Sequence, residues 1–241
     1  MHDTSFSPAG RSTGSRGSAG GAVSFVRQSW AGLRVLLLLT VLLGGLYPLA
    51  VTAVGQTAFA WQANGSLVRA DGTRATSVDD AGDDGAPVIG SALVGQDFGG
   101  PGTQPQWFHG RPSAGGYDTL ASGGSNLGPT NPDLVDAIEQ RRAAVAAEDG
   151  VDPATVPPDA LTASASGLDP HVSPAYAEQQ AARVAAARGL DVAQVRALVE
   201  QESAGRVLGV LGDPRVNVLA LNLALERLDA PGDAPRDADG S

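Results

Sequence analysis

A run of twenty uncharged residues, from Val35 to Val54, constrains this chain more than any other feature of its sequence. Eight leucines and four valines lie in the run. At roughly −0.3 to −0.6 kcal/mol each, these twelve residues favour membrane insertion by about 4 to 7 kcal/mol. A helix of this length spans roughly 30 Å, the thickness of the hydrocarbon core. We therefore predict one transmembrane helix over residues 33–56.

Three residues inside this run suggest contact with another helix. Pro48 removes a backbone N–H, which membrane helices tolerate when neighbouring helices satisfy the freed carbonyl. Gly44 and Gly45 lie one turn earlier and would let a second backbone approach closely. The glycine-rich composition also accounts for them, with 32 glycines in 241 residues. We interpret Gly44, Gly45 and Pro48 as a membrane-helix packing segment.

The charges that flank the run predict its orientation. Four arginines and one aspartate give +3 before it: Arg11, Arg16, Arg27, Arg34 and Asp3. Arg69 is the first basic residue after it. The positive-inside rule then places the N-terminus in the cytoplasm and everything after about residue 56 outside. A cleaved signal peptide is the alternative, because Ala58-Phe59-Ala60 has the form of a cleavage site. The long run and leader favour the single-pass anchor, and the remainder is extracytoplasmic in both cases.

Composition excludes several functional classes. The formal net charge is −10, and all sixteen basic residues are arginine. Such a chain has no basic face for phosphates, so we expect no nucleic-acid partner. Zero cysteines exclude disulfide scaffolds, thiolate zinc sites and cysteine nucleophiles. Three histidines and no D-x-[DN]-x-[DN]-G loop disfavour a metal site of any kind.

Amino-acid composition divides the chain into four parts, one of which is the predicted transmembrane helix. Residues 1–24 have almost no large apolar group and are expected to form a disordered cytoplasmic tail. Residues 61–228 are expected to form a single extracytoplasmic α+β domain, in which residues 71–87 are a mobile acidic loop. Residues 229–241 read as a disordered acidic tail.

The expected domain places short strands before about four helices. Strands are predicted over residues 66–68, 88–94 and 106–109. Asn131, Ser173 and Asp191 are predicted to cap helices that follow them, the first running to about Ala147 and the second ending at Gly189. Residues 216–228 fit both a strand and a helical face, and Asn217 as a cap favours a helix.

The turn-rich loops suggest three alternative roles: an anion-binding site, a catalytic site, or a purely structural network. The loop Ser122–Pro132 leads to a helix N-terminus and could cradle an anion, but it lacks the G-x-x-x-x-G-K-[ST] spacing. Ser125, His171 and Asp169 could form the catalytic set of a membrane-anchored hydrolase, although Ser125 is not in a G-x-S-x-G elbow. We favour a rigid network of turns held by serine and asparagine side chains, without catalytic residues.

These stretches resemble a known family. Its most specific matches are SGGSNLGPTNP at residues 122–132, SGLDPHVS at residues 166–173, Arg183 with residues 187–190, and residues 212–225. The sequence resembles the C subunit of the Kdp potassium-transporting P-type ATPase. The resemblance implies a non-catalytic subunit of a high-affinity, ATP-driven potassium importer in the bacterial cell membrane. Its implied partners are a channel-like potassium-conducting subunit, a phosphorylated pump subunit and a small hydrophobic subunit.

The resemblance also suggests site residues and raises the question of ATP. Eleven residues are assigned to partner binding or to structure: Arg111, Ser122, Gly123, Gly124, Ser125, Asn126, Asn131, Asp169, His171, Arg215 and Asn217. The family is described as a catalytic chaperone that raises the ATP affinity of the pump subunit, and residues 120–125 are similar to the serine-glycine-glycine signature invoked for it. The predicted topology keeps this loop away from cytoplasmic ATP, so assembly is the leading role and no bound cofactor is expected.

Overall fold

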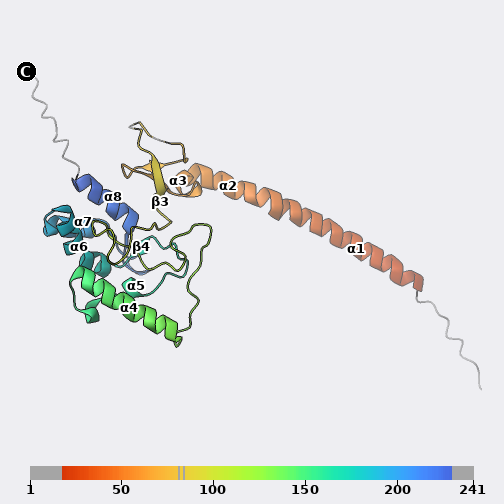
Figure 1. Cartoon of the computed structure of the whole chain (residues 1–241). Helices are drawn as coiled ribbons and strands as arrows, with labels where there is room; N and C mark the ends of the chain where they lie inside the picture. Colours follow the sequence, from red (N-terminus) through yellow and green to blue (C-terminus); the bar gives the residue numbers. More distant parts are fainter. Residues whose placement is uncertain (1–17, 81, 84, 230–241) are drawn as a thin grey trace, which may run out of the picture. The chain divides into compact units, whose positions relative to one another are not determined.

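The computed structural model describes residues 18–80, 82–83 and 85–229 (Figure 1). The chain falls into two compact units, one ending at Phe59 and the other beginning at Ala60. Each unit is described by itself below.

The first unit is one helical rod. It comprises α1 (Ser18–Val41), a π-helical turn (Leu42–Leu46) and α2 (Tyr47–Ala58). Residues Val23–Ala58 are long and apolar enough to cross a membrane, with a mean hydropathy of 2.2. The predicted single spanning helix is present and is longer than residues 33–56. The prediction of disorder is wrong for residues 18–24, because a helix started by the apolar run gains one backbone hydrogen bond for each residue added. Residues 1–17 lie outside the described part.

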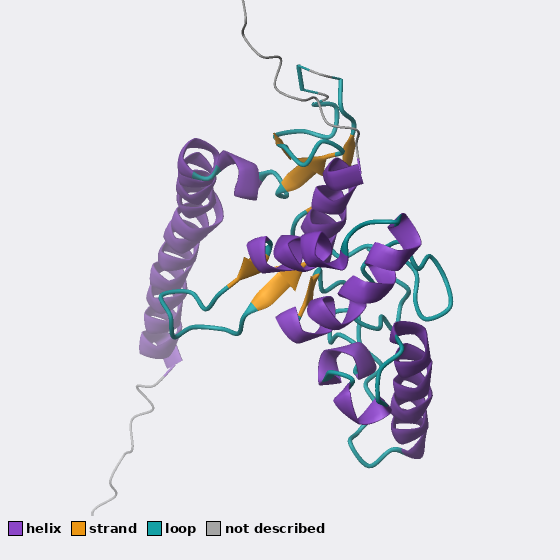
Figure 2. Ribbon diagram, turned by 90° about the vertical axis from the view of Figure 1, so that its left-hand side faces the viewer, coloured by secondary structure: helices purple, strands orange, loops and turns teal. Residues whose placement is uncertain are grey.

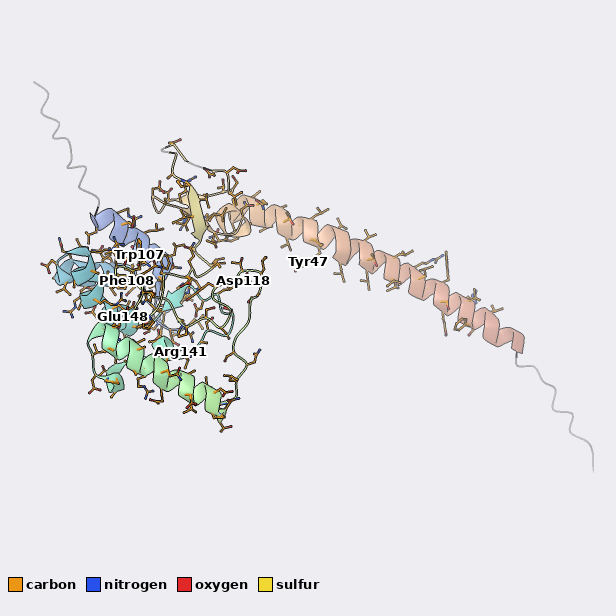
Figure 3. The ribbon with its side chains drawn as sticks, in the orientation of Figure 1. Tyr47, Trp107, Phe108, Asp118, Arg141 and Glu148 are labelled. Atoms are coloured by element: carbon orange, nitrogen blue, oxygen red, sulfur yellow. The ribbon has the colours of Figure 1, made fainter. Side chains whose placement is uncertain are left out.

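The π-turn explains how Pro48 is accommodated. Tyr47, which is labelled in Figure 3, directly precedes the proline. Its N–H donates to the carbonyl of Leu42, five residues back. In a regular α-helix the ring of Pro48 would clash with the carbonyl of Gly44. Local π adjustments are one of the means by which membrane helices accommodate proline. The chain therefore makes this adjustment within its own helix.

The second unit opens with α3 (Ala60–Ala63) and a small antiparallel sheet. The strands are β1 (Leu67–Arg69), β2 (Arg74–Ala75) and β3 (Val88–Ser91), in the order β2-β1-β3. The two predicted strands in this region are confirmed, the second being shorter than expected. β2 lies inside the predicted acidic loop 71–87, and Asp80 of that loop forms an ion pair with Arg69. The mobility of the loop stays a prediction.

Helices dominate the rest of the unit. They are α4 (Pro132–Asp149), a 3₁₀ turn (Pro153–Thr155), α5 (Pro158–Leu161), α6 (Pro174–Arg188), α7 (Val192–Gln201) and α8 (Val218–Asp229). Asn131, Ser173 and Asp191 cap α4, α6 and α7 as predicted, each accepting a backbone N–H of the first turn. Gly150 and Gly189 end α4 and α6 in the left-handed conformation that favours glycine.

A second small sheet was not predicted. It consists of β4 (His171–Val172), β5 (Ser203–Ala204) and β6 (Arg215–Asn217), antiparallel in the order β4-β6-β5 (Figure 2). The ambiguous stretch 216–228 contains both structures, because its first residues form β6 and the rest form α8. Asn217 caps α8 as predicted, since its Oδ1 accepts the Ala220 N–H at 3.0 Å. The α+β fold class is confirmed.

The predicted strand 106–109 is wrong. This segment is an irregular loop whose backbone groups pair with side-chain amides rather than with another strand. Phe108 donates to Oδ1 of Asn222 at 2.9 Å and accepts from its Nδ2 at 3.0 Å. His109 makes the same two contacts with Gln180, at 2.7 and 3.2 Å. The side chain of Phe108 is fully buried in the core, which is formed by residues of α4 to α8, β4 and β6.

Candidate functional site

The candidate site is a junction of three loops, residues 111–117, 122–124 and 162–171. Arg111 joins the first to the third, with its Nη1 3.2 Å from Oδ2 of Asp169 and its Nη2 donating to the Thr162 carbonyl at 3.3 Å. Ser113 donates to the Gly167 carbonyl at 2.7 Å and accepts the Tyr117 N–H at 2.9 Å. We call this set the loop junction.

The serine-glycine-glycine segment packs directly on the third loop. The Gly123 N–H and the Ser122 hydroxyl both donate to the Ser166 carbonyl, at 2.8 and 3.0 Å. A Cβ on Gly124 would lie 3.1 Å from the Ala165 carbonyl oxygen, so the backbones approach closely. Gly167 has φ +69°, and a Cβ there would lie 2.7 Å from the Gly123 carbonyl oxygen. These glycines permit the contact between the two loops.

Asp169 and His171 form the centre of the junction. Asp169 accepts the His171 N–H through Oδ1 at 3.0 Å, and Nδ1 of His171 lies 3.5 Å from the same oxygen. Hydrogen bonding to His171, together with Arg111, lowers the pKa of the Asp169 carboxyl against the opposing effect of burial. Asp169 is therefore ionised at neutral pH and holds Arg111 in place.

The other predicted site residues lie around this junction with different surroundings. Ser125 and Asn126 are exposed, and within the described residues no hydrogen bond joins Ser125 to His171 or Asp169. Asn131 is the α4 cap, and Arg215 lies in β6 opposite Ala204. Asn217 pairs with His171 across β6 and β4, and its Nδ2 donates to the Ala92 carbonyl at 2.8 Å. Within the described residues, the structure joins His171 to Asp169 and leaves Ser125 apart from both.

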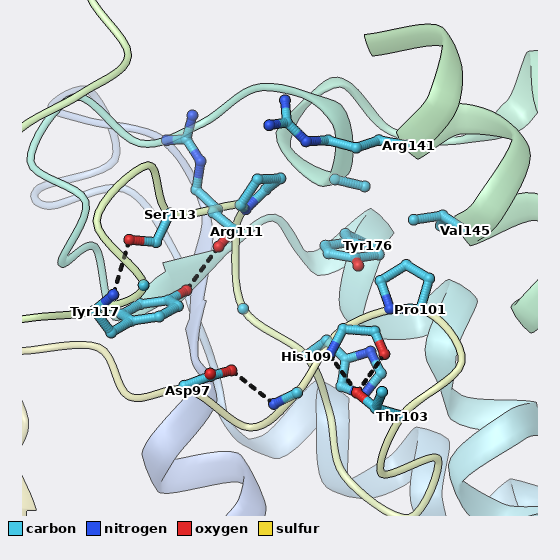
Figure 4. A pocket seen from close by; sticks show the side chains of 16 residues that line it. Asp97, Pro101, Thr103, His109, Arg111, Ser113, Tyr117, Arg141, Val145 and Tyr176 are labelled. Carbon is cyan, nitrogen blue, oxygen red and sulfur yellow. Dashed lines mark hydrogen bonds between the residues drawn. The ribbon is translucent and has the colours of Figure 1, made fainter. Parts of the chain in front are cut away.

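A cavity of about 340 Å³ borders the loop junction (Figure 4). Side chains of Arg111, Arg141, Tyr117, Tyr176 and His109 line it. Burial raises the pKa of Tyr117 to about 12, and its hydroxyl donates to the Arg111 carbonyl at 2.7 Å. Across the described ranges, no three His, Cys, Asp or Glu side chains gather as metal ligands would. The lining therefore offers polar groups that are held in place by hydrogen bonds.

A buried charge network beside the cavity was missed as a site. Arg183 forms an ion pair with Asp149 at 2.9 Å, and its Nη1 donates to the carbonyls of Pro105 and Trp107 at 2.6 and 3.0 Å. Its Nη2 also donates to Oε1 of Gln180 at 2.7 Å. Arg183 belongs to a motif of the resemblance, and Gln180 lies at helical spacing from Ala177 and Val184, on the apolar face of α6. A polar residue among apolar neighbours was the signal available in the sequence.

These motifs belong to a recognised family. The family model KdpC, described as the c chain of the K⁺-transporting ATPase, matches residues 29–227. The chain belongs to the KdpC family. The match runs from the membrane helix to the end of α8, so it includes the loop junction and the charge network.

Three relatives agree with the family assignment, each named potassium-transporting ATPase KdpC subunit. The one from Kineococcus radiotolerans is 54% identical over 204 residues, covering 84% of this chain and 94% of the relative. Those from Sorangium cellulosum and Nitratidesulfovibrio vulgaris are 52% and 51% identical, covering 80% and 86% of this chain and 94% and 95% of the relatives. The predicted resemblance is confirmed. A KdpC-family chain with one spanning helix fits a single-pass membrane subunit of a potassium-transporting ATPase.

Proposed function

We propose that this KdpC-family chain is a non-catalytic subunit that assembles and stabilises an ATP-driven potassium import complex. Its partners are a channel-like potassium-conducting subunit, a P-type pump subunit and, where present, a small hydrophobic subunit. The observation that carries this proposal is the loop junction. Arg111 and Ser122 make bonds that fix one loop to another, and the Asp169–His171 contact stiffens the third loop. This arrangement suits a rigid binding surface better than a reaction centre.

The membrane helix supports a role beyond anchoring. A Cβ built on Gly44 or Gly45 meets nothing within 4 Å in the described chain, so neither glycine is required by an intramolecular contact. Both lie in the π-turn beside Pro48. Small residues at such a position let a neighbouring helix approach closely. We assign this face to contact with another subunit of the complex.

The charge distribution supports an N-terminus in the cytoplasm and the α+β domain outside. In that orientation the Ser122–Gly124 segment never meets cytoplasmic ATP. Its Ser122 hydroxyl and Gly123 N–H are already bonded to Ser166, which favours a structural role for the segment. The effect on ATP affinity for which the family is described then acts through subunit contacts, without bound nucleotide.

The glycines provide the test of the assembly role. Replacing Gly44 and Gly45 together by Leu should leave membrane insertion intact, because it adds apolar surface. It should also lower several-fold the amount of channel-like and pump subunits that co-purify with the chain. Ala31→Leu with Gly32→Leu is the matched control, since it enlarges an adjacent small pair on α1 and a Cβ on Gly32 also meets nothing within 4 Å.

Unchanged co-purification of the Gly44/Gly45 variant would reduce the helix to a plain anchor. The anchored hydrolase remains the alternative function, and the same purified complex separates the two. A hydrolase would show turnover of a substrate, and Ser125→Ala would abolish that turnover without changing the free energy of unfolding. We expect no such turnover, since Ser125 is exposed and makes no hydrogen bond to His171 or Asp169 in the described structure.

A further inference from the structure

The loop between β5 and β6 exposes four aliphatic side chains in five residues. Their exposed fractions are 53% for Val207, 86% for Leu208, 71% for Val210 and 59% for Leu211. Gly209 is the fifth residue, so this hairpin tip, Val207–Leu211, carries no polar side chain. Folding normally buries such residues, because exposed aliphatic surface is unfavourable in water.

The hairpin tip is a built structure. Val207 and Leu211 exchange both backbone hydrogen bonds, at 2.9 and 3.0 Å, and the Val210 N–H donates to the Val207 carbonyl at 3.2 Å. An ion pair between Arg206 and Asp213, at 3.0 Å, closes the hairpin below the tip. The exposed side chains are therefore held on an ordered turn.

Leu208 occupies the apex in a conformation that leucine rarely adopts. Its φ is +54°, followed by +76° at Gly209. Two successive positive φ values are typical of a tight hairpin turn, in which Asn-Gly or Gly-Gly is preferred. A bulky residue with positive φ is strained, and such strain clusters at functional positions. Leu208 thus combines a strained backbone conformation with an exposed apolar side chain.

The base of the hairpin lies beside Trp61, which follows the membrane helix closely in the sequence. α2 ends at Ala58, and the second unit begins two residues later at Ala60. Trp61 of that unit lines one cavity together with Glu202, which precedes β5, and Asn217, the last residue of β6. An extended chain advances about 3.3 Å per residue, so the tip lies within roughly 17 Å of this base. The tip therefore belongs to the same part of the second unit as Trp61, the third residue after α2.

We propose that the hairpin tip Val207–Leu211 inserts into the interfacial layer of the membrane that the chain spans, as a second membrane contact of the α+β domain. Lipid accepts aliphatic side chains without shape or hydrogen-bond matching. A protein interface more often relies on Trp, Tyr or Arg anchors, and the tip has none. The paired backbone of the tip also reduces the cost of leaving water. The proposal requires a spanning helix and is independent of the assembly role.

The absence of cysteine from the sequence allows a direct test. Leu208→Cys in the full chain is labelled with the fluorophore NBD and reconstituted in phosphatidylcholine nanodiscs, with and without lipids that carry a doxyl quencher near the headgroup. We expect blue-shifted emission and several-fold quenching. Leu120→Cys is the matched control, because Leu120 is 96% exposed on another loop and should report water. Val210→Cys repeats the test at a residue without positive φ.

Three results would overturn the proposal. If labels at positions 208 and 210 both report water in nanodiscs that hold this chain alone, the tip does not insert into lipid. Shielding that appears only after the other subunits are added would instead identify a protein groove as the occupant. Equal quenching at positions 208 and 120 would show that the whole domain lies on the bilayer, without a specific role for the tip.

Discussion

His109 is a deeply buried histidine whose ring stays neutral at physiological pH. Burial, together with the nearby Arg183 guanidinium, lowers its pKa to about 4. Nδ1 lies 3.6 Å from Oε2 of Glu148, and burial raises the pKa of that carboxyl. Nδ1 makes no hydrogen bond within the described residues. The pair is a polar contact in a low-dielectric site, with no charge on the histidine to form an ion pair.

The neutral ring predicts a loss of stability in acid. The unfolded chain takes up a proton on this histidine near pH 6.5, whereas the folded chain does so only near pH 4. Between these values the unfolded state binds more protons, so the free energy of unfolding falls as the pH drops, by on the order of 3 kcal/mol. Thermal unfolding of the full chain in detergent at pH 7 and pH 4.5 measures the fall.

His109→Gln should flatten this pH dependence, even if its stability at pH 7 is lower. His171→Gln serves as the control and should retain the fall, because His109 is still present. Identical pH dependence in the parent and in His109→Gln would assign the acid sensitivity to other groups.

At the scale of elements, two helices hold an irregular loop as a strand would. Asn222 of α8 and Gln180 of α6 each present both the acceptor and the donor of a carboxamide to one loop residue. Both amides are almost fully buried, as is the Phe108 side chain. Arg183 and Arg188 of α6 add bonds to the carbonyls of residues 105–107. The loop 105–109 is thereby fixed without a sheet.

Replacing Asn222 by Leu should be costly although the size of the side chain is nearly preserved. The change leaves a buried N–H and a buried carbonyl of Phe108 without partners, at about 1 to 3 kcal/mol each. We expect a loss of about 2 to 5 kcal/mol in the free energy of unfolding, measured by urea titration.

Gln194→Leu is the matched control for this change, because Gln194 is exposed on α7. Its effect should stay within about 0.5 kcal/mol. A comparable loss in both variants would mean that the amide contacts to Phe108 carry no special weight.

At the scale of the whole molecule, a single apolar helix joins two regions of different charge. Arg27 and Arg34 lie on α1 before the uncharged run, and the second unit is rich in acids. Guanidinium groups on the cytoplasmic side favour retention there. This asymmetry is the physical basis for the proposed orientation.

Reporter fusions test the orientation directly. A reporter at the N-terminus should be active only as a cytoplasmic marker, and one after residue 229 only as an extracytoplasmic marker. Arg27→Gln with Arg34→Gln should weaken this preference, because it removes two of the positive charges. The opposite placement of both reporters would refute the topology and restore direct ATP contact as a possibility. Membrane-bound chain at its full-length mass would exclude cleavage after Ala60.

The sequence alone determined the features that depend on neighbours along the chain. The membrane helix follows from the uncharged run Val35–Val54, since apolar transfer depends on composition and length. The caps Asn131, Ser173 and Asp191 each bond to an N–H two or three residues ahead, so their signal is local. The family motifs likewise identified the chain before its fold was known.

Only the tertiary structure decided the pairings between distant segments. The second sheet joins His171 to Asn217 and Ser203 to Val216, in strands too short to leave a periodic pattern. The backbone N–H and carbonyl groups of segment 106–109 need hydrogen-bond partners, as those of a strand do. The side-chain amides of Asn222 and Gln180 provide these partners from 114 and 71 residues away. Hydrogen bonds across such separations depend on how the helices pack, and packing energies are summed over the whole core.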